Sequence, residues 1–151
     1  MIKKHIPTYK IELEKFFKLV LFNYVFSNGD AHIKNFSVIQ TTQKDYILSS
    51  TYDLLCTRLH LSNDTDLALH LFEDGFSNTY LKFGFYVYDD FFRFGRKLGI
   101  RNSRIDKLIN DFKGKDEQVI NLISRSFLKD SLKKVYVDYY KEKIDRLNID
   151  H

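Results

Sequence analysis

The sequence predicts a mainly α-helical domain that carries one small β-hairpin near its start. Apolar residues recur at spacings of three and four in 9–26 and again across 89–147, as in helices with a buried face. Between these regions, two short strand-like runs flank a polar stretch. The chain has 151 residues, 44% hydrophobic and 29% charged, which is enough for one domain, 1–151, with a single core.

The first predicted element is a long helix. Its apolar positions form a stripe that consists of Leu13, Phe16, Phe17, Val20, Tyr24 and Val25. Phe22 and Phe26 widen this stripe, so we expect the helix to be buried on more than one side. Thr8 can cap its beginning, and the turn residues 27–30 (SNGD) end it.

A β-hairpin is predicted within 36–49. The runs 36–39 (FSVI) and 46–48 (YIL) have the composition of strands, and the polar residues 40–45 connect them. From 52 to 85, apolar residues mix with Asn, Asp and Gly without a dominant period, so no element is assigned there.

Four helices are expected in the remainder, 89–147. They cover 89–98, a segment from Asn102 to Phe112, 116–129 and 131–147. The chain is 16% aromatic, and the Phe- and Tyr-rich tract 72–94 is expected to form core or a protein interface, not a platform for stacking bases.

Composition bounds the class of protein. Cys56 is the only cysteine and cannot form an internal disulfide, so we expect a cytoplasmic protein in which this thiol is buried. No segment approaches the ~18 apolar residues of a membrane span. The formal net charge is +4, but the basic residues are scattered, which favours a solvated surface over direct binding of nucleic acid. His60 and His70 have no partner at metal-ligand spacing, so no zinc site is expected.

The loop 28–37 (NGDAHIKNFS) contains most of the residues that are candidates for catalysis and metal binding. Asp30 and Asn35 are five positions apart, and Asp53 lies eighteen beyond Asn35. Paired strands lie ~4.8 Å apart, so the hairpin brings Asn35 and Asp53 together, where their oxygens could share a magnesium ion. Asp30, outside the hairpin, is free to accept a proton from a substrate hydroxyl. Phosphoryl transfer from ATP requires these groups.

Each of these residues also has a purely structural interpretation. Asp30 and Asn35 could satisfy backbone groups within a turn, and Asp53 could cap a helix. His32 could orient Asp30 or only bond within the loop. Lys34 could neutralise phosphate charge or be a solvated lysine. The spacings and the hairpin together favour the catalytic interpretation for Asp30, Asn35 and Asp53.

The loop 28–37, together with Thr51–Leu54 (TYDL), resembles the HipA family. Its Asp-x-His-x-x-Asn core is also similar to the loops of phosphoinositide kinases and aminoglycoside phosphotransferases. HipA-like proteins are serine/threonine kinases, often the toxin of a bacterial toxin–antitoxin pair. The resemblance covers about 9–60 and implies the C-terminal lobe of a protein-kinase-like fold.

The resemblance also implies roles for single residues. Asp30 would be the catalytic base, and Asn35 and Asp53 would bind magnesium and thereby ATP. His32 and Lys34 match the family's string and are candidate catalytic residues with less defined roles.

The chain offers no counterpart of the N-terminal lobe, because the segment before the loop is one predicted helix and no Gly-x-Gly occurs. A separately encoded N-terminal lobe, a longer parent chain or an inactive remnant would each explain this. Expected partners are such a lobe or a HipB-like antitoxin. An aminoacyl-tRNA synthetase or another translation factor is the type of substrate that the resemblance implies. The alternatives are a small-molecule kinase of the aminoglycoside or choline type and an inactive binding module.

Overall fold

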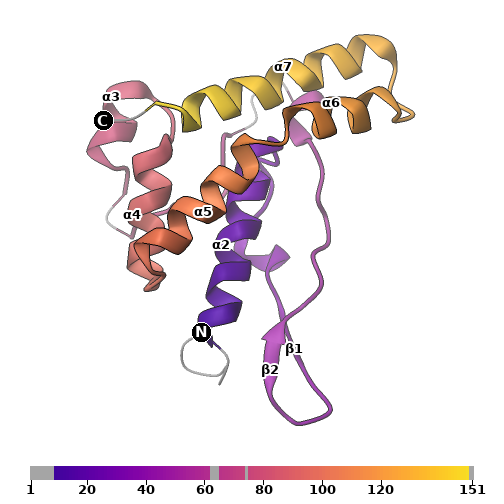
Figure 1. Cartoon of the computed structure of the whole chain (residues 1–151). Coiled ribbons are helices and arrows are strands. Elements are labelled where there is room, and N and C mark those ends of the chain that lie inside the picture. Colours follow the sequence, from indigo (N-terminus) through magenta and orange to yellow (C-terminus); the bar gives the residue numbers. More distant parts are fainter. Residues whose placement is uncertain (1–8, 62–64, 74, 150–151) are drawn as a thin grey trace.

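The computed structural model of the chain describes residues 9–61, 65–73 and 75–149, and the predicted cap Thr8 lies outside them. The described part is mainly helical with a two-stranded antiparallel hairpin, which confirms the predicted fold class at this level (Figure 1). Its elements, in chain order, are α2 (Tyr9–Val25), η1 (Ile33–Asn35), β1 (Val38–Gln40), β2 (Tyr46–Leu48), η2 (Thr57–Leu59), α3 (Asn78–Phe83), α4 (Tyr88–Leu98), α5 (Asn102–Lys113), α6 (Asp116–Ser124) and α7 (Asp130–Leu147). None of the described helices is long and apolar enough to cross a membrane.

Helix α2 is the centre of the core. It contacts α4, α7 and β2, and α4 and α7 each also contact α5. Phe17 is fully buried and stacks on Phe94 of α4, while Tyr24 contacts Phe91 and donates a hydrogen bond to the carbonyl of Tyr86. Burying one such ring stabilises the fold by roughly 1.5–3 kcal/mol. Residues on several sides of α2 are buried, which confirms the expectation of a helix covered on more than one side.

The helices predicted in the second half are present, and one boundary is wrong. Helix α6 ends at Ser124, five residues before the predicted end at 129. The hydroxyl of Ser124 donates to the carbonyl of Asn121, and that of Ser126 donates to the carbonyl of Ile123, each at 2.7 Å. The N–H of Ser126 also bonds the carbonyl of Ile123, at 3.1 Å, in place of the helical bond from residue 127, so the chain turns here toward α7.

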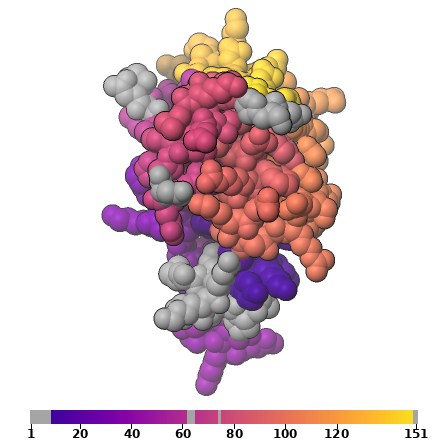
Figure 2. All heavy atoms as spheres, turned by 90° about the vertical axis from the view of Figure 1, so that its left-hand side faces the viewer, coloured from indigo at the N-terminus to yellow at the C-terminus, as the bar shows by residue number. Residues whose placement is uncertain are grey.

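The hairpin begins two residues later than predicted and projects from the helical body (Figure 2). Val38 pairs with Leu48 and Gln40 with Tyr46. Buried Glu12 of α2 accepts a hydrogen bond from the backbone N–H of Leu48 at 2.8 Å. The hairpin is therefore tied to α2 near its open end, while its tip extends away from α7 (Figures 1 and 2).

Within 52–85, unassigned from sequence, the residues that the structure describes form only short helices, η2 and α3. Ser77 caps α3, because its hydroxyl accepts from the N–H of Tyr80 at 2.9 Å, and it donates to Asp90 of α4. Cys56 is buried, as expected. Tertiary contacts, more than local periodicity, give this segment its conformation.

Candidate active site

The loop after α2 begins with a tight change of direction. Ser27 has a positive φ of 53°, and Asn28 is buried beneath it. The amide of Asn28 donates to the side chain of Asn23 and to the carbonyl of Asp53, both at 2.9 Å. Asn28 therefore links the end of α2 to the segment that follows the hairpin, and it does more than shape a turn.

Asp30 and His32 lie together at the surface. His32 Nε2 is 3.1 Å from Asp30 Oδ1, and the two side chains are 61% and 65% exposed. Between them, Ala31 is buried and anchors the loop to the body of the molecule. The carboxylate of Asp30 is thus presented to solvent on a fixed backbone, where a substrate hydroxyl could reach it.

Asn35 and Asp53 meet across the open end of the hairpin. Asn35 Nδ2 lies 2.6 Å from Asp53 Oδ2, and the hydrogen bond joins residues eighteen positions apart. Asp53 has a φ of 57°, a left-handed conformation that Asp adopts more readily than most residues. The structure therefore brings together the two side chains that the spacing pairs.

Tyr52 holds the loop from the same side. Its hydroxyl lies 3.0 Å from the carbonyl of Lys34 and 3.3 Å from Ser37 Oγ. The side chain of Lys34 is exposed, so its backbone, not its ammonium group, is fixed by these contacts. Tyr52 was missed as a positioning residue by sequence reasoning, although it stands inside the TYDL string.

Two pairs of contacting side chains make up the candidate site. Asp30 with His32, and Asn35 with Asp53, lie on one loop and its partner segment, and Lys34 lies between them in sequence. Among the described residues, no lysine or arginine forms an ion pair with Asp53. The arrangement offers one proton acceptor and a separate pair of oxygen donors for a hard cation.

Comparison with known proteins agrees with the predicted resemblance. The family model of the HipA-like C-terminal domain matches residues 1–120. A protein of Haemophilus influenzae named "Putative kinase" is 28% identical over 157 residues, which cover 98% of this chain and 46% of that protein. "Putative kinase Y4dM" of Sinorhizobium fredii is 32% identical over 65 residues, 43% of this chain and 16% of that protein.

The match spans about half the length of the Haemophilus protein, and a smaller share of the Sinorhizobium protein. The family match nevertheless covers 120 of the 151 residues, including the loop, the hairpin and Asp53. On this match, the chain belongs to the family of HipA-like C-terminal domains.

Proposed function

We propose that this chain is the catalytic half of a serine/threonine kinase that transfers the γ-phosphate of ATP to a protein hydroxyl. The observation that carries the proposal is the contact between Asn35 and Asp53, at 2.6 Å, beside the loop that presents Asp30. The membership of the HipA-like family and the names of the two relatives support it. In this proposal the helical body with its hairpin is the C-terminal lobe of a two-lobed kinase.

Asn35 and Asp53 fit a magnesium site. Magnesium takes a few carboxylate or amide oxygens together with phosphates and water. Rotation of the Asn35 amide about its last torsion replaces Nδ2 by Oδ1, so both side chains then offer oxygen at the point where they now share a hydrogen bond. A magnesium ion held there would offset the charge of the ATP phosphates.

Asp30 accepts the proton of the attacking hydroxyl in the proposed reaction. The hydroxyl oxygen forms a bond to the γ-phosphorus, the bond from that phosphorus to the bridging oxygen breaks, and ADP leaves. His32 holds the Asp30 carboxylate in one orientation through the 3.1 Å contact. Lys34 is placed on the same exposed loop and can approach phosphate oxygens.

The other half of the ATP site comes, in this proposal, from a longer parent chain or a separate N-terminal lobe. The relatives are about twice as long or longer, and the matched part of the Haemophilus protein covers 98% of this chain. A role in a cytoplasmic toxin–antitoxin pair with a HipB-like partner, acting on a translation factor such as an aminoacyl-tRNA synthetase, is the physiological form of the proposal.

The metal site can be tested on the chain by itself. We expect Mn²⁺, used as a paramagnetic stand-in for Mg²⁺, to broaden the amide NMR signals of 28–37 and 53. Asp53→Asn should lower the affinity by roughly 100-fold or more, because a direct ligand contributes at least as much as an outer-shell partner. Asp111→Asn, an exposed acid paired with Lys107 on α5, is the matched control and should bind as wild type. Equal binding by the Asp53 and Asp111 variants would contradict the assigned site.

Catalysis is tested on the chain joined to, or co-expressed with, its N-terminal half. We expect Mg·ATP-dependent phosphorylation of a protein serine or threonine, and Asp30→Asn should lower kcat by roughly 10²–10⁴-fold. Phosphorylation of an aminoglycoside or choline, but of no protein, would favour a small-molecule kinase. Biological activity that survives Asp30→Asn would indicate a binding module.

A further inference from the structure

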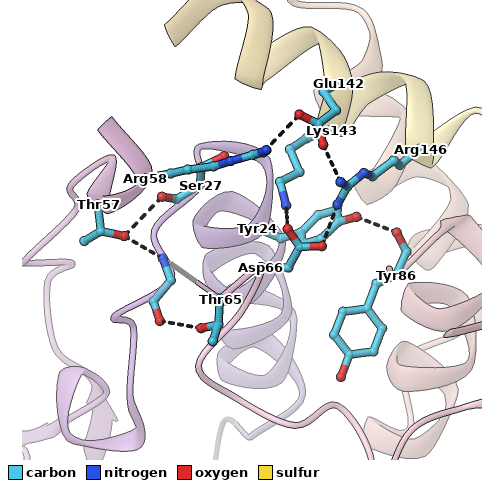
Figure 3. Close-up of polar contacts among 11 residues, drawn as sticks. Tyr24, Ser27, Thr57, Arg58, Thr65, Asp66, Tyr86, Glu142, Lys143 and Arg146 are labelled. Carbon is cyan, nitrogen blue, oxygen red and sulfur yellow. Dashed lines mark hydrogen bonds and ion pairs between the residues drawn. The ribbon is translucent and has the colours of Figure 1, made fainter. Parts of the chain in front are cut away.

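The backbone N–H and the carbonyl of Gly29 each bond to a threonine side chain. These threonines, Thr57 and Thr65, are labelled in Figure 3. The backbone N–H of Gly29 donates to Thr57 Oγ1 at 2.8 Å, and Thr65 Oγ1 donates to the carbonyl of Gly29 at 3.2 Å. Thr57 Oγ1 also donates to the carbonyl of Ser27 at 3.2 Å. Gly29 directly precedes Asp30, so these hydroxyls set the position from which the Asp30 carboxylate is presented.

Each of these threonines is followed in sequence by a charged residue that α7 binds. Arg58 Nη1 lies 3.0 Å from Glu142 Oε2, and its guanidinium stacks over the ring of Tyr139 at 4.1 Å. Asp66 is held by the buried ammonium of Lys143 and, at 2.5 Å, by Arg146. The two supports of the loop therefore converge on one face of α7.

The charged residues behind the loop form one connected network. Arg146 bonds both Asp66 and Glu142, so it joins the support through Thr65 to the support through Thr57 (Figure 3). Lys143 is fully buried and Arg146 is only 15% exposed. Removal of one member of such a network leaves an uncompensated buried charge, so the arrangement is strongly specified.

We propose that α7 positions the catalytic loop through this network, with Thr57 and Thr65 as the positioning residues that set Asp30. The catalytic part of this inference rests on the kinase function proposed above; the support of the loop does not. The family match ends at residue 120, so the α7 residues Glu142, Lys143 and Arg146 lie outside it.

The first test is hydrogen exchange at the Gly29 amide, measured by NMR on the full chain. Thr57→Val keeps the shape of the side chain and removes the hydroxyl. It should accelerate exchange at Gly29 by roughly tenfold, as expected for one lost hydrogen bond. Thr57→Ser restores the hydroxyl and should restore the protection. Core amides in α5 should exchange as in wild type in both variants. Unchanged exchange at Gly29 in Thr57→Val would overturn the proposal.

The link to α7 is tested with the charged residues. Arg58→Gln and Asp66→Asn should each accelerate exchange at Gly29. The control is Arg104→Gln, which removes a comparable ion pair between α5 and Glu14 of α2, 2.6 Å in length and away from the loop. If Asp66→Asn does not fold, Arg58→Gln alone tests the role of α7, because the Arg58 side chain is 30% exposed and its substitution should leave the protein folded. Exchange in Arg58→Gln no faster than in Arg104→Gln would overturn the role of α7.

The catalytic consequence is measured on the assembled kinase. Thr57→Val should lower kcat roughly tenfold with the KM for ATP within about twofold of wild type, and Thr57→Ser should recover kcat. Suppose that Thr57→Val accelerates exchange at Gly29 but the assembled protein transfers no phosphate. This result would uphold the structural role of Thr57 in the loop and refute the kinase proposal. Wild-type kcat in an active Thr57→Val enzyme would refute the positioning role.

Discussion

Lys143 carries a charge into the interior of the molecule. Its side chain is fully buried against the ring of Tyr24, 4.4 Å from the ammonium nitrogen, and against Asp66. Burial lowers the pKa of Lys143 to about 8, although the attraction of Asp66 acts to raise it. Burial raises the pKa of Asp66, but Lys143 and Arg146 outweigh this effect, and its net shift is downward. Near neutral pH both partners are charged.

The lowered pKa of Lys143 makes stability depend on pH. Between about pH 8 and the ordinary lysine pKa of 10.5, the unfolded chain binds a proton that the folded chain has lost, so the free energy of unfolding rises with pH. Relative to Lys143→Met, wild type should gain about 1–2 kcal/mol between pH 8 and about 9.5, below the ordinary tyrosine pKa. Urea unfolding of both proteins at several pH values measures this difference. A difference independent of pH would contradict the assigned shift.

Single residues differ in how far the sequence predicts their positions. Asn35 and Asp53 could be grouped because a hairpin of local origin joins them, and Asp30 because it lies on the same loop as Asn35. Thr57 and Thr65 could not, since a threonine suits many surroundings and their contacts with Gly29 depend on where the chain returns. The pairing of Asp66 with Arg146 spans eighty positions and depends on the docking of α7, which no local pattern encodes.

Helices α4 and α5 pack closely where Gly95 of α4 faces Ile105 of α5. A Cβ atom added at Gly95 would lie 2.8 Å from both Cγ1 and Cδ1 of Ile105, which is fully buried. Gly95 is itself buried in the interior of α4, where glycine weakens a helix. The close packing of the two helices therefore requires a residue that is unfavourable for the helix alone.

Gly95→Ala sets these two effects against each other. Alanine favours the helix by about 1 kcal/mol, whereas overpacking a buried site costs roughly 1–3 kcal/mol. We expect a net loss of stability, visible as a lower urea midpoint. Gly114→Ala, where no atom lies within 4 Å of the added Cβ, is the control and should be neutral or stabilising. A Gly95→Ala protein at least as stable as the Gly114→Ala protein would show that Ile105 moves aside freely.

Elements with a strong period were predictable, and elements without one were not. Helices α4, α5 and α7 follow an apolar repeat, so their positions could be predicted to within one or two residues. Helix α6 ends before a turn in which the N–H and the hydroxyl of Ser126 both bond the carbonyl of Ile123, and the apolar repeat does not encode these bonds. In 52–85, contacts such as Ser77 with Asp90 decide the conformation, and the partner lies on another helix.

The whole described chain shares one hydrophobic core. Buried residues of α2, α4, α5 and α7 form a single cluster that includes Phe36, just before β1, and the N–H of Leu48 in β2 bonds Glu12 of α2. We therefore predict that urea unfolding is one cooperative transition, as for most domains of this size. Far-UV circular dichroism and tyrosine fluorescence should give the same midpoint. Separate midpoints would divide the chain into independent units and would contradict the predicted single domain.

Cys56 stands directly before Thr57 and is buried, with 9% of the residue exposed. A thiol in this position reacts with a bulky alkylating reagent only after its segment has opened. Because the chain has no other cysteine, the alkylation rate of the wild-type protein depends on the opening of one segment, in which Thr57 holds Gly29. The alkylation rate of Cys56 therefore reports how readily the loop opens. A bound nucleotide or partner that stabilises the closed loop would lower this rate.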